Sequence, residues 1–133
     1  MPKVFTSETQ KIGEVGENIA VKFLVKHGFD ILDRNYTKKW GEIDIVAEKD
    51  GKLYFIEVKS VAHLPAEAEA KEGETRPEDN MHPWKLKRLS RIIQTYLLSK
   101  RHDEPEWQVD LLVIFLNLQD KTAKIKVVKD IIL

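Results

Sequence analysis

Two acidic residues lie at matching places on either side of an Asp50-Gly51 dipeptide. Asp-Gly between apolar-rich segments is a strong signal for a β-hairpin, and residues 42–48 and 52–59 supply two such segments. Counting back from a two-residue turn places Asp44 opposite Glu57. Directly opposed Cβ atoms in a sheet lie about 4.5–5.5 Å apart, so two carboxylates there need a positive charge between them. Hard oxygen ligands suit Mg²⁺ or Mn²⁺, and the pattern predicts a divalent-cation site on this hairpin.

The same register adds a basic side chain to the site. Lys59 falls opposite Glu42, on the side of the hairpin that carries both acids, because side chains alternate faces along a strand. A cation held by Asp44 and Glu57 would bind a phosphate oxygen and acidify a bound water, and Lys59 would orient that water or balance charge on the phosphate. We count Asp44, Glu57 and Val58 as the candidate metal-binding set.

The alternative is structural. Glu42, Asp44, Glu57 and Lys59 would also make a cross-strand salt-bridge ladder on a solvated face, and spacing alone does not choose between the two interpretations. Glu-x-Lys recurs at residues 69–71, in a polar stretch without a hairpin partner. The opposite face of the hairpin is expected to be core, with these residues: Ile43, Ile45, Ala47, Tyr54, Ile56 and Val58.

Basic residues gather in a second segment, which has no acid between Met81 and His102. Such a segment is a candidate for contacts with the phosphate backbone of a nucleic acid, and a solvated helix face is the alternative. The candidate nucleic-acid-binding residues are Lys85, Lys87, Arg88 and Arg91. Trp40 and Trp84 flank these sites and could stack on a base, although packing is the commoner role for a tryptophan.

The elements that must position these residues follow from periodicity. Residues 7–27 predict a helix, with a capping box from Ser7 to Gln10 and a stop at Gly28. One stripe of this helix is apolar and contains Ile12, Val15, Ile19 and Phe23. A neighbouring strip consists mostly of small residues and contains Gly13, Gly16, Glu17, Ala20 and Leu24. Glycines cost a helix about 1 kcal/mol each, so we expect a sheet to approach closely there. Glu17 would then project toward the sheet and hold a metal-bound water.

The rest of the chain alternates strands with one more helix. Residues 29–32 predict a short strand, 34–40 a polar connection, and 60–80 a mobile loop rich in Ala and Glu. A second helix is expected from about Pro83 to Lys100, with a buried stripe of Leu86, Leu89, Ile93 and Tyr96 or Leu97. Two strands, 107–116 and 123–132, complete the pattern. The order predicts a single α/β domain with one mixed sheet and helices packed on it.

Composition excludes several classes of function. The 133 residues carry 22 basic and 22 acidic side chains, so any attraction to nucleic acid must come from a local patch. Without cysteine the chain has no disulfide, zinc–cysteine site or thiol nucleophile, and a cytoplasmic location is expected. No signal peptide, membrane-spanning run or Gly-rich phosphate loop is present, so neither a membrane partner nor a nucleotide cofactor is expected. The sequence does not indicate an oligomeric state.

The hairpin with Asp44, Glu57 and Lys59, together with several other stretches, resembles the YraN-like family of small bacterial proteins. This family is a branch of the PD-(D/E)XK, or restriction-endonuclease-like, superfamily. The matching stretches are Gly13-Glu14-Val15-Gly16-Glu17 with Ala20, residues 28–32, Arg34-Asn35-Tyr36, residues 41–47, Phe55-Ile56-Glu57-Val58-Lys59, Lys85 and Val109-Asp110. The chain departs from the family at Ser60-Val61, where a basic residue is usual, and at Gln108-Val109-Asp110, where Arg-Phe-Asp is usual.

The resemblance implies a restriction-endonuclease-like αβββαβ core with a mixed central sheet. It also implies Asp44, Glu57 and Lys59 as the catalytic set, with Glu17 as the helix acid. The expected function is a Mg²⁺- or Mn²⁺-dependent nuclease acting on DNA, with branched or single-stranded structures as candidate substrates. A nucleic-acid-binding module that keeps the fold without cutting, and a scaffold that binds a protein partner, are the alternatives. For Asp110 the sequence leaves open a functional role and a capped buried network.

Overall fold

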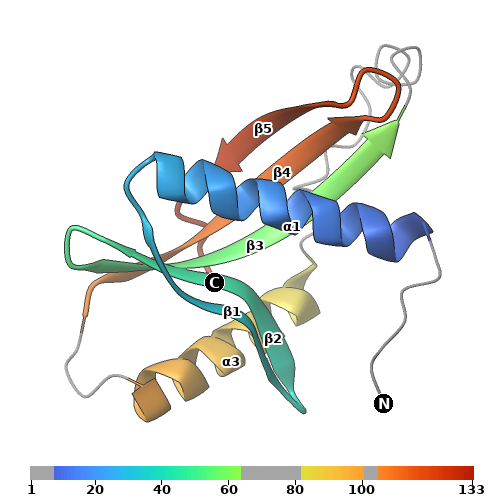
Figure 1. Ribbon diagram of the computed structural model, residues 1–133. Coiled ribbons are helices and arrows are strands. Elements are labelled where there is room, and N and C mark those ends of the chain that lie inside the picture. Colours follow the sequence, from blue (N-terminus) through green and yellow to red (C-terminus); the bar gives the residue numbers. More distant parts are fainter. Residues whose placement is uncertain (1–7, 64–81, 101–104) are drawn as a thin grey trace, which may run out of the picture.

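The computed structural model describes residues 8–63, 82–100 and 105–133, which form one five-stranded sheet and two helices (Figure 1). The elements follow the predicted order of helix, three strands, helix and two strands. Their bounds are α1 (Glu8–Lys26), β1 (Asp30–Lys38), β2 (Gly41–Lys49), β3 (Lys52–His63), α3 (Pro83–Lys100), β4 (Trp107–Asn117) and β5 (Thr122–Val128). Of the helices described, none is both long and apolar enough to cross a membrane.

The sheet is mixed, as the element order predicts. Its strands lie in the sequence order β1-β2-β3-β4-β5, and β3 and β4 are parallel while the other neighbours are antiparallel. Two parallel neighbours need a crossover connection, and α3 belongs to that connection. The two helices lie on opposite faces of the sheet (Figure 1), so the central strands are covered on both sides.

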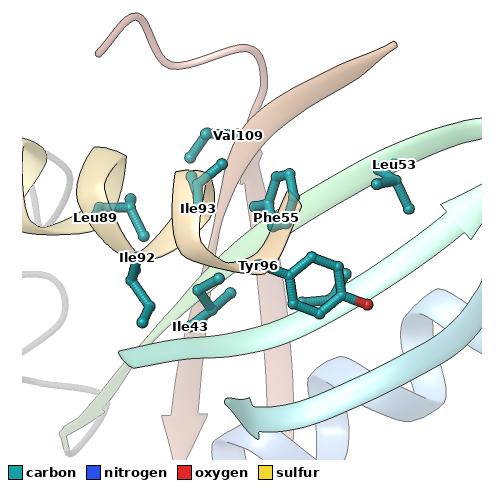
Figure 2. Close-up of a cluster of buried hydrophobic side chains, with 9 residues drawn as sticks. Ile43, Leu53, Phe55, Leu89, Ile92, Ile93, Tyr96 and Val109 are labelled. Carbon is teal, nitrogen blue, oxygen red and sulfur yellow. The ribbon is translucent and has the colours of Figure 1, made fainter. Parts of the chain in front are cut away.

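The α3 face holds one of the two hydrophobic clusters, drawn in Figure 2. Phe55 and Tyr96 meet there edge to face, with ring centroids 5.6 Å apart. The helix buries Leu89, Ile92, Ile93 and Tyr96, which confirms most of the predicted stripe and adds Ile92. Ile43 also lies in this cluster, so the expectation that it shares a face with Ile45 and Ala47 is wrong.

The α1 face buries the strip of small residues. Gly16 and Ala20 are buried, whereas Val15 in the predicted apolar stripe is 48% exposed. A Cβ added to Gly16 would collide with the Ser60 side chain on β3, which confirms the close approach of the sheet at that position. A Cβ on Gly13 would meet nothing within 4 Å, so close approach does not explain the second glycine.

On the α1 side of the sheet, Ile45, Ala47 and Ile56 form the second cluster with Ala20 and Leu24. Tyr54 and Val58 pack against it as partly buried side chains. The predicted core face of the hairpin is therefore confirmed except at Ile43.

The hairpin turn has the predicted form. Asp50 and Gly51 have φ values of 52° and 79°, the left-handed backbone that two-residue hairpin turns require. Lys49 pairs with Lys52, and the register continues to Ile45 opposite Ile56. The turn and the first five pairs agree with the sequence prediction.

Two strands are longer than predicted, because pairing extends polar segments. β1 runs to Lys38 along β2, so most of the expected polar connection 34–40 is strand. β3 runs to His63 along β4, so the first four residues of the expected loop 60–80 are strand as well. The remainder of that loop through Asn80 and the proposed cap at Ser7 lie outside the described residues. β5 ends at Val128, earlier than expected.

Candidate active site at the fork of the hairpin

β2 and β3 separate beyond Ile45 and Ile56, one residue short of the predicted pairing of Asp44 with Glu57. Figure 1 shows the two strands spreading apart, with β2 staying beside β1 and β3 beside β4. The Val58 amide donates to Asp44 Oδ2 at 2.8 Å across the opening. The predicted pairs of Asp44 with Glu57 and of Glu42 with Lys59 are therefore absent from the described ladder, and a fork takes their place.

Beside the fork, β1 contains one residue with a left-handed backbone. Arg34 pairs with Ile45 and Tyr36 with Ile43, which leaves Asn35 beside Asp44. Asn35 has a φ of 52°, and asparagine tolerates this left-handed conformation better than most residues. This left-handed residue therefore lies beside Asp44, whose Oδ2 faces the Val58 amide of β3.

Asp44 and Glu57 line one pocket of about 230 Å³ between the fork and α3. We call it the acid pocket. Burial raises the pKa of Asp44 to about 6, and the neighbouring Glu42 and Glu17 carboxylates add to the rise. Burial, followed by the charge of Asp44, raises the pKa of Glu57 to about 8. The two acids therefore share about one proton near neutral pH, because two buried like charges do not readily ionise together.

Glu57 is the less satisfied acid of the pair. Its Oε1 atom is buried and has no hydrogen-bond partner, which is a costly state for a polar oxygen. Within the described ranges no three or more His, Asp or Glu side chains gather tightly enough to hold a metal by themselves. The site thus offers two carboxylates, a number that suits Mg²⁺, since this ion keeps several waters and binds through one or two carboxylates.

A second hollow lies on the other side of Asp44. It has a volume of about 440 Å³, and Glu17, Lys59, Val58 and Ser60 line it together with Asp44. Asp44 belongs to both hollows, whereas Glu57 lines only the first of these two and Lys59 only the second. Asp44 thus connects the acid pocket with Lys59. Lys59 is exposed and forms no ion pair with Glu42 in the described structure, so the alternative of a cross-strand salt-bridge ladder is not seen there.

Glu17 projects toward the fork, as predicted, and β1 holds it there. Its Oε1 accepts hydrogen bonds from Arg34 Nη2 at 3.2 Å and Asn35 Nδ2 at 3.0 Å. The charge of Glu17 reaches Asp44 and raises its pKa. The sequence analysis assigned no role to Arg34 or Asn35. Both belong to a stretch that this chain shares with the YraN-like family, and that match was the only indication that they have a role.

Lys85 lies in the acid pocket. The sequence predicted it as a nucleic-acid-binding residue and did not place it beside the two acids. It lines the pocket with both acids, and its charge opposes the rise in the pKa of each. The approach of α3 to the fork brings Lys85 there, and only the tertiary fold reveals that approach. Lys59 and Lys85 therefore come to the acids from different elements.

The basic residues of the helix, Lys85 included, are exposed. Lys87 extends to solvent, while Arg88 and Arg91 each lie over a tryptophan. The Arg88 guanidinium is 5.8 Å from the centroid of the Trp84 ring and 3.4 Å from the Trp40 carbonyl oxygen. These side chains keep a positive face beside the acid pocket.

Asp110 belongs to a buried network. Its Oδ1 accepts hydrogen bonds from Gln108 Nε2 at 2.7 Å and from the Asp130 amide at 3.0 Å. The Ile131 amide also donates to the Val109 carbonyl oxygen. Asp110 thus fastens the segment that follows β5 to β4, as expected if it caps a buried network.

Comparison with known proteins gives a consistent result. The profile of a family described as "Uncharacterised protein family UPF0102" matches residues 16–114. A UPF0102 protein of Campylobacter hominis is 41% identical over 104 residues, which cover 78% of this chain and 83% of the relative. One from Caldicellulosiruptor bescii is 33% identical over 125 residues, or 91% of this chain and 96% of the relative. The matched range contains Glu17, the fork and Lys85, and this chain belongs to the UPF0102 family.

Proposed function

We propose that this protein is a divalent-metal-dependent nuclease that hydrolyses phosphodiester bonds in DNA. The observation that carries the proposal is the acid pair at the fork: two carboxylates with raised pKa values, one of them with a buried oxygen that lacks a partner. Raised pKa values and unsatisfied buried groups concentrate at functional sites. The resemblance to the PD-(D/E)XK superfamily supports the same conclusion.

The residues of the fork fit Mg²⁺ or Mn²⁺. Asp44 and Glu57 would supply carboxylate oxygens, which these hard cations prefer. The Val58 carbonyl would add a third oxygen. In a strand the N–H and C=O of one residue face the same neighbour, and the Val58 amide faces Asp44. When bound, the cation would neutralise phosphate charge and lower the pKa of water.

The side chains around the acids have separate roles. Lys59 in the second hollow orients water or balances charge that develops on the phosphate. Glu17, fixed by Arg34 and Asn35, keeps a negative charge near Asp44 and positions water on the α1 side. Lys85 lies on the α3 side of the acids and contacts a phosphate oxygen of the substrate.

The exposed basic residues of α3 support a nucleic-acid substrate. Lys85, Lys87, Arg88 and Arg91 lie on one helix that has no acidic residue from Pro83 to Lys100. These positively charged side chains beside the acid pocket attract a polyanion, although the net charge of the chain is zero. This placement favours a nucleic acid over a neutral partner protein.

A binding module that does not cut is the second candidate. The departure at Ser60-Val61 favours it, because the basic residue usual in the family is missing after Lys59. Ser60 instead packs under Gly16 of α1. Lys85 offers another positive charge at the acids, which supports the nuclease in spite of this departure.

The test is cleavage of a panel of labelled single-stranded, flapped, four-way and linear duplex DNAs by the full chain. Reactions contain Mn²⁺, Mg²⁺ or EDTA, and Asp44→Ala serves as the inactive variant. We expect at least one DNA to be cut with a metal, and neither EDTA nor the variant to support cutting. If the wild type binds these DNAs and cuts none, the non-cutting module replaces the nuclease.

A further inference from the structure

Trp84 is an exposed aromatic side chain in the wall of the acid pocket. It lines this pocket together with Asp44, Glu57, Lys85 and Arg88, and 59% of its surface is accessible. A large apolar side chain with most of its surface in solvent gains little stability from burial. Its place beside two acids and two cations gives it an opportunity to contact whatever enters the pocket.

The other two tryptophans are occupied by packing. Trp40 donates its indole Nε1–H to Thr95 Oγ1 at 3.1 Å, and it packs against the α3 cluster. Trp107 lies edge-on to Phe55, with centroids 5.6 Å apart. Trp84 has no such ring partner among the described residues, and the Arg88 guanidinium lies over its ring.

Arg88 gives Trp84 the environment of a stacking platform. The guanidinium lies 5.8 Å from the ring centroid, which is within the range of a cation–π contact. It also reaches the Trp40 carbonyl oxygen. Two contacts from one side chain restrain both the arginine and the ring, so less side-chain entropy is lost when a ligand stacks on the indole.

The pocket admits an unpaired nucleotide more readily than a duplex. Its volume is about 230 Å³, and Glu57 Oε1 at its wall is buried. A phosphate in a flexible single strand reaches such recessed acids more readily than one held in a double helix. In a duplex the faces of the bases are stacked on each other, so a tryptophan can stack only on a base that is unpaired, terminal or flipped.

We propose that the pocket takes a single-stranded segment of nucleic acid, with an unpaired base stacked on Trp84 and the adjoining phosphate between Lys85 and the acid pair. This inference rests on the proposed nuclease function and defines its substrate class. Stacking selects for unpaired bases without reading their sequence, because every base has a π face. Lys85 and Arg88 contribute charge, which acts on paired and unpaired strands alike.

The test is equilibrium binding in EDTA, where no metal-dependent cutting occurs. The probes are a fluorescent oligodeoxythymidylate of about 12 nucleotides and a blunt duplex of the same length. The variants are Trp84→Ala and Trp84→Phe. Leu98→Ala is the matched control, because Leu98 is an 81% exposed apolar residue of the same helix away from the pocket lining.

Trp84→Ala should weaken single-strand binding by about 5- to 100-fold, the effect of losing one base–aromatic stack. Trp84→Phe should recover most of the loss, and duplex binding should change little in every variant. Leu98→Ala should bind as the wild type does. Unchanged single-strand binding in Trp84→Ala, or an equal loss for duplex and single strand, would overturn the inference.

A separate cleavage assay distinguishes the two proposals. If Trp84→Ala binds and cuts single strands as the wild type does, the substrate inference fails and the nuclease stands. If single-strand binding depends on Trp84 and no DNA is cut with Mn²⁺, the nuclease fails and the pocket remains a single-strand site. A protein that neither binds nor cuts contradicts both.

Discussion

The raised pKa values of Asp44 and Glu57 are a stability cost that a cation would relieve. A carboxyl whose pKa is higher in the folded chain binds more protons there than in the unfolded chain. Between the ordinary values near 4 and the folded values of about 6 and 8, stability therefore falls as pH rises. The buried Glu57 Oε1 without a partner is the atom at which a cation would offset that cost.

This sign gives a prediction for Glu57→Gln. The amide keeps the size of the side chain and does not ionise, so the variant should gain stability over the wild type as pH rises from 5 to 9. At pH 8.5 the gain should be about 1–3 kcal/mol. The measurement is urea unfolding at several pH values in EDTA. Parallel pH profiles for the two proteins would mean that Glu57 is not the strained acid.

Lys59 is expected to act in the chemical step. It lines the hollow that shares Asp44, is exposed and has no ion pair with Glu42. An interaction that strengthens only in the transition state changes turnover and leaves binding intact. Lys59→Ala should lower single-turnover cleavage with Mn²⁺ by roughly 10²–10³-fold while keeping DNA affinity.

Lys52→Ala is a suitable control for Lys59→Ala, because Lys52 lies at the turn end of the same strand. Equal cleavage rates for Lys59→Ala and the wild type would remove the catalytic role. A parallel loss of DNA affinity would assign Lys59 to binding instead.

At the scale of elements, the sequence predicted the features that depend on local residues and missed those that depend on tertiary packing. Asp50-Gly51 fixed the turn and the first pairs of the hairpin, because turn geometry is local. At the fork β2 stays paired with β1 and β3 with β4, and no pattern within residues 42–59 predicts that separation. Lys85 joins the site because α3 packs across the fork. The small-residue strip of α1 was correctly predicted to meet the sheet at Gly16, but not at Gly13, where no neighbour lies within 4 Å.

The two glycines of α1 provide a matched pair of variants. A Cβ at position 16 would collide with Ser60, whereas one at position 13 meets open space. Gly16→Ala should destabilise the protein by about 1–3 kcal/mol through overpacking. Gly13→Ala should stabilise it by up to about 1 kcal/mol through helix propensity. Denaturant unfolding measures both, and similar changes in the two variants would show that α1 does not sit on β3 as described.

The basic face of α3 predicts a salt effect on DNA binding. Replacing Lys87, Arg88 and Arg91 with Ala should flatten the dependence of log K on log salt by at most about three units, near one per lost phosphate contact. The control replaces three exposed lysines of α1, Lys11, Lys22 and Lys26, with Ala. A slope unchanged by the α3 variant, or changed equally by both, would remove α3 from the interface.

At the scale of the whole molecule, the fold concentrates charge that cancels over the chain. The net charge is zero, yet the fork gathers Glu17, Glu42, Asp44 and Glu57 while α3 presents cations beside them. Fold class and element order were predictable from sequence, and the predicted side chains Glu17, Asp44 and Glu57 lie close together in the fold. The division of the site into two hollows joined at Asp44 required the structure, because strand alternation alone placed all the polar side chains on one face.

The most direct test of the account is a calorimetric titration of the full chain with Mn²⁺ and Mg²⁺ near pH 8. The wild type should bind one cation at the fork, and both Asp44→Ala and Glu57→Ala should lose most of that binding. Glu48→Ala, which removes an acid of β2 on the turn side of the fork, should bind as the wild type does. Undiminished binding in both fork variants, or no binding by the wild type, would contradict a metal site at Asp44 and Glu57 and with it the proposed nuclease.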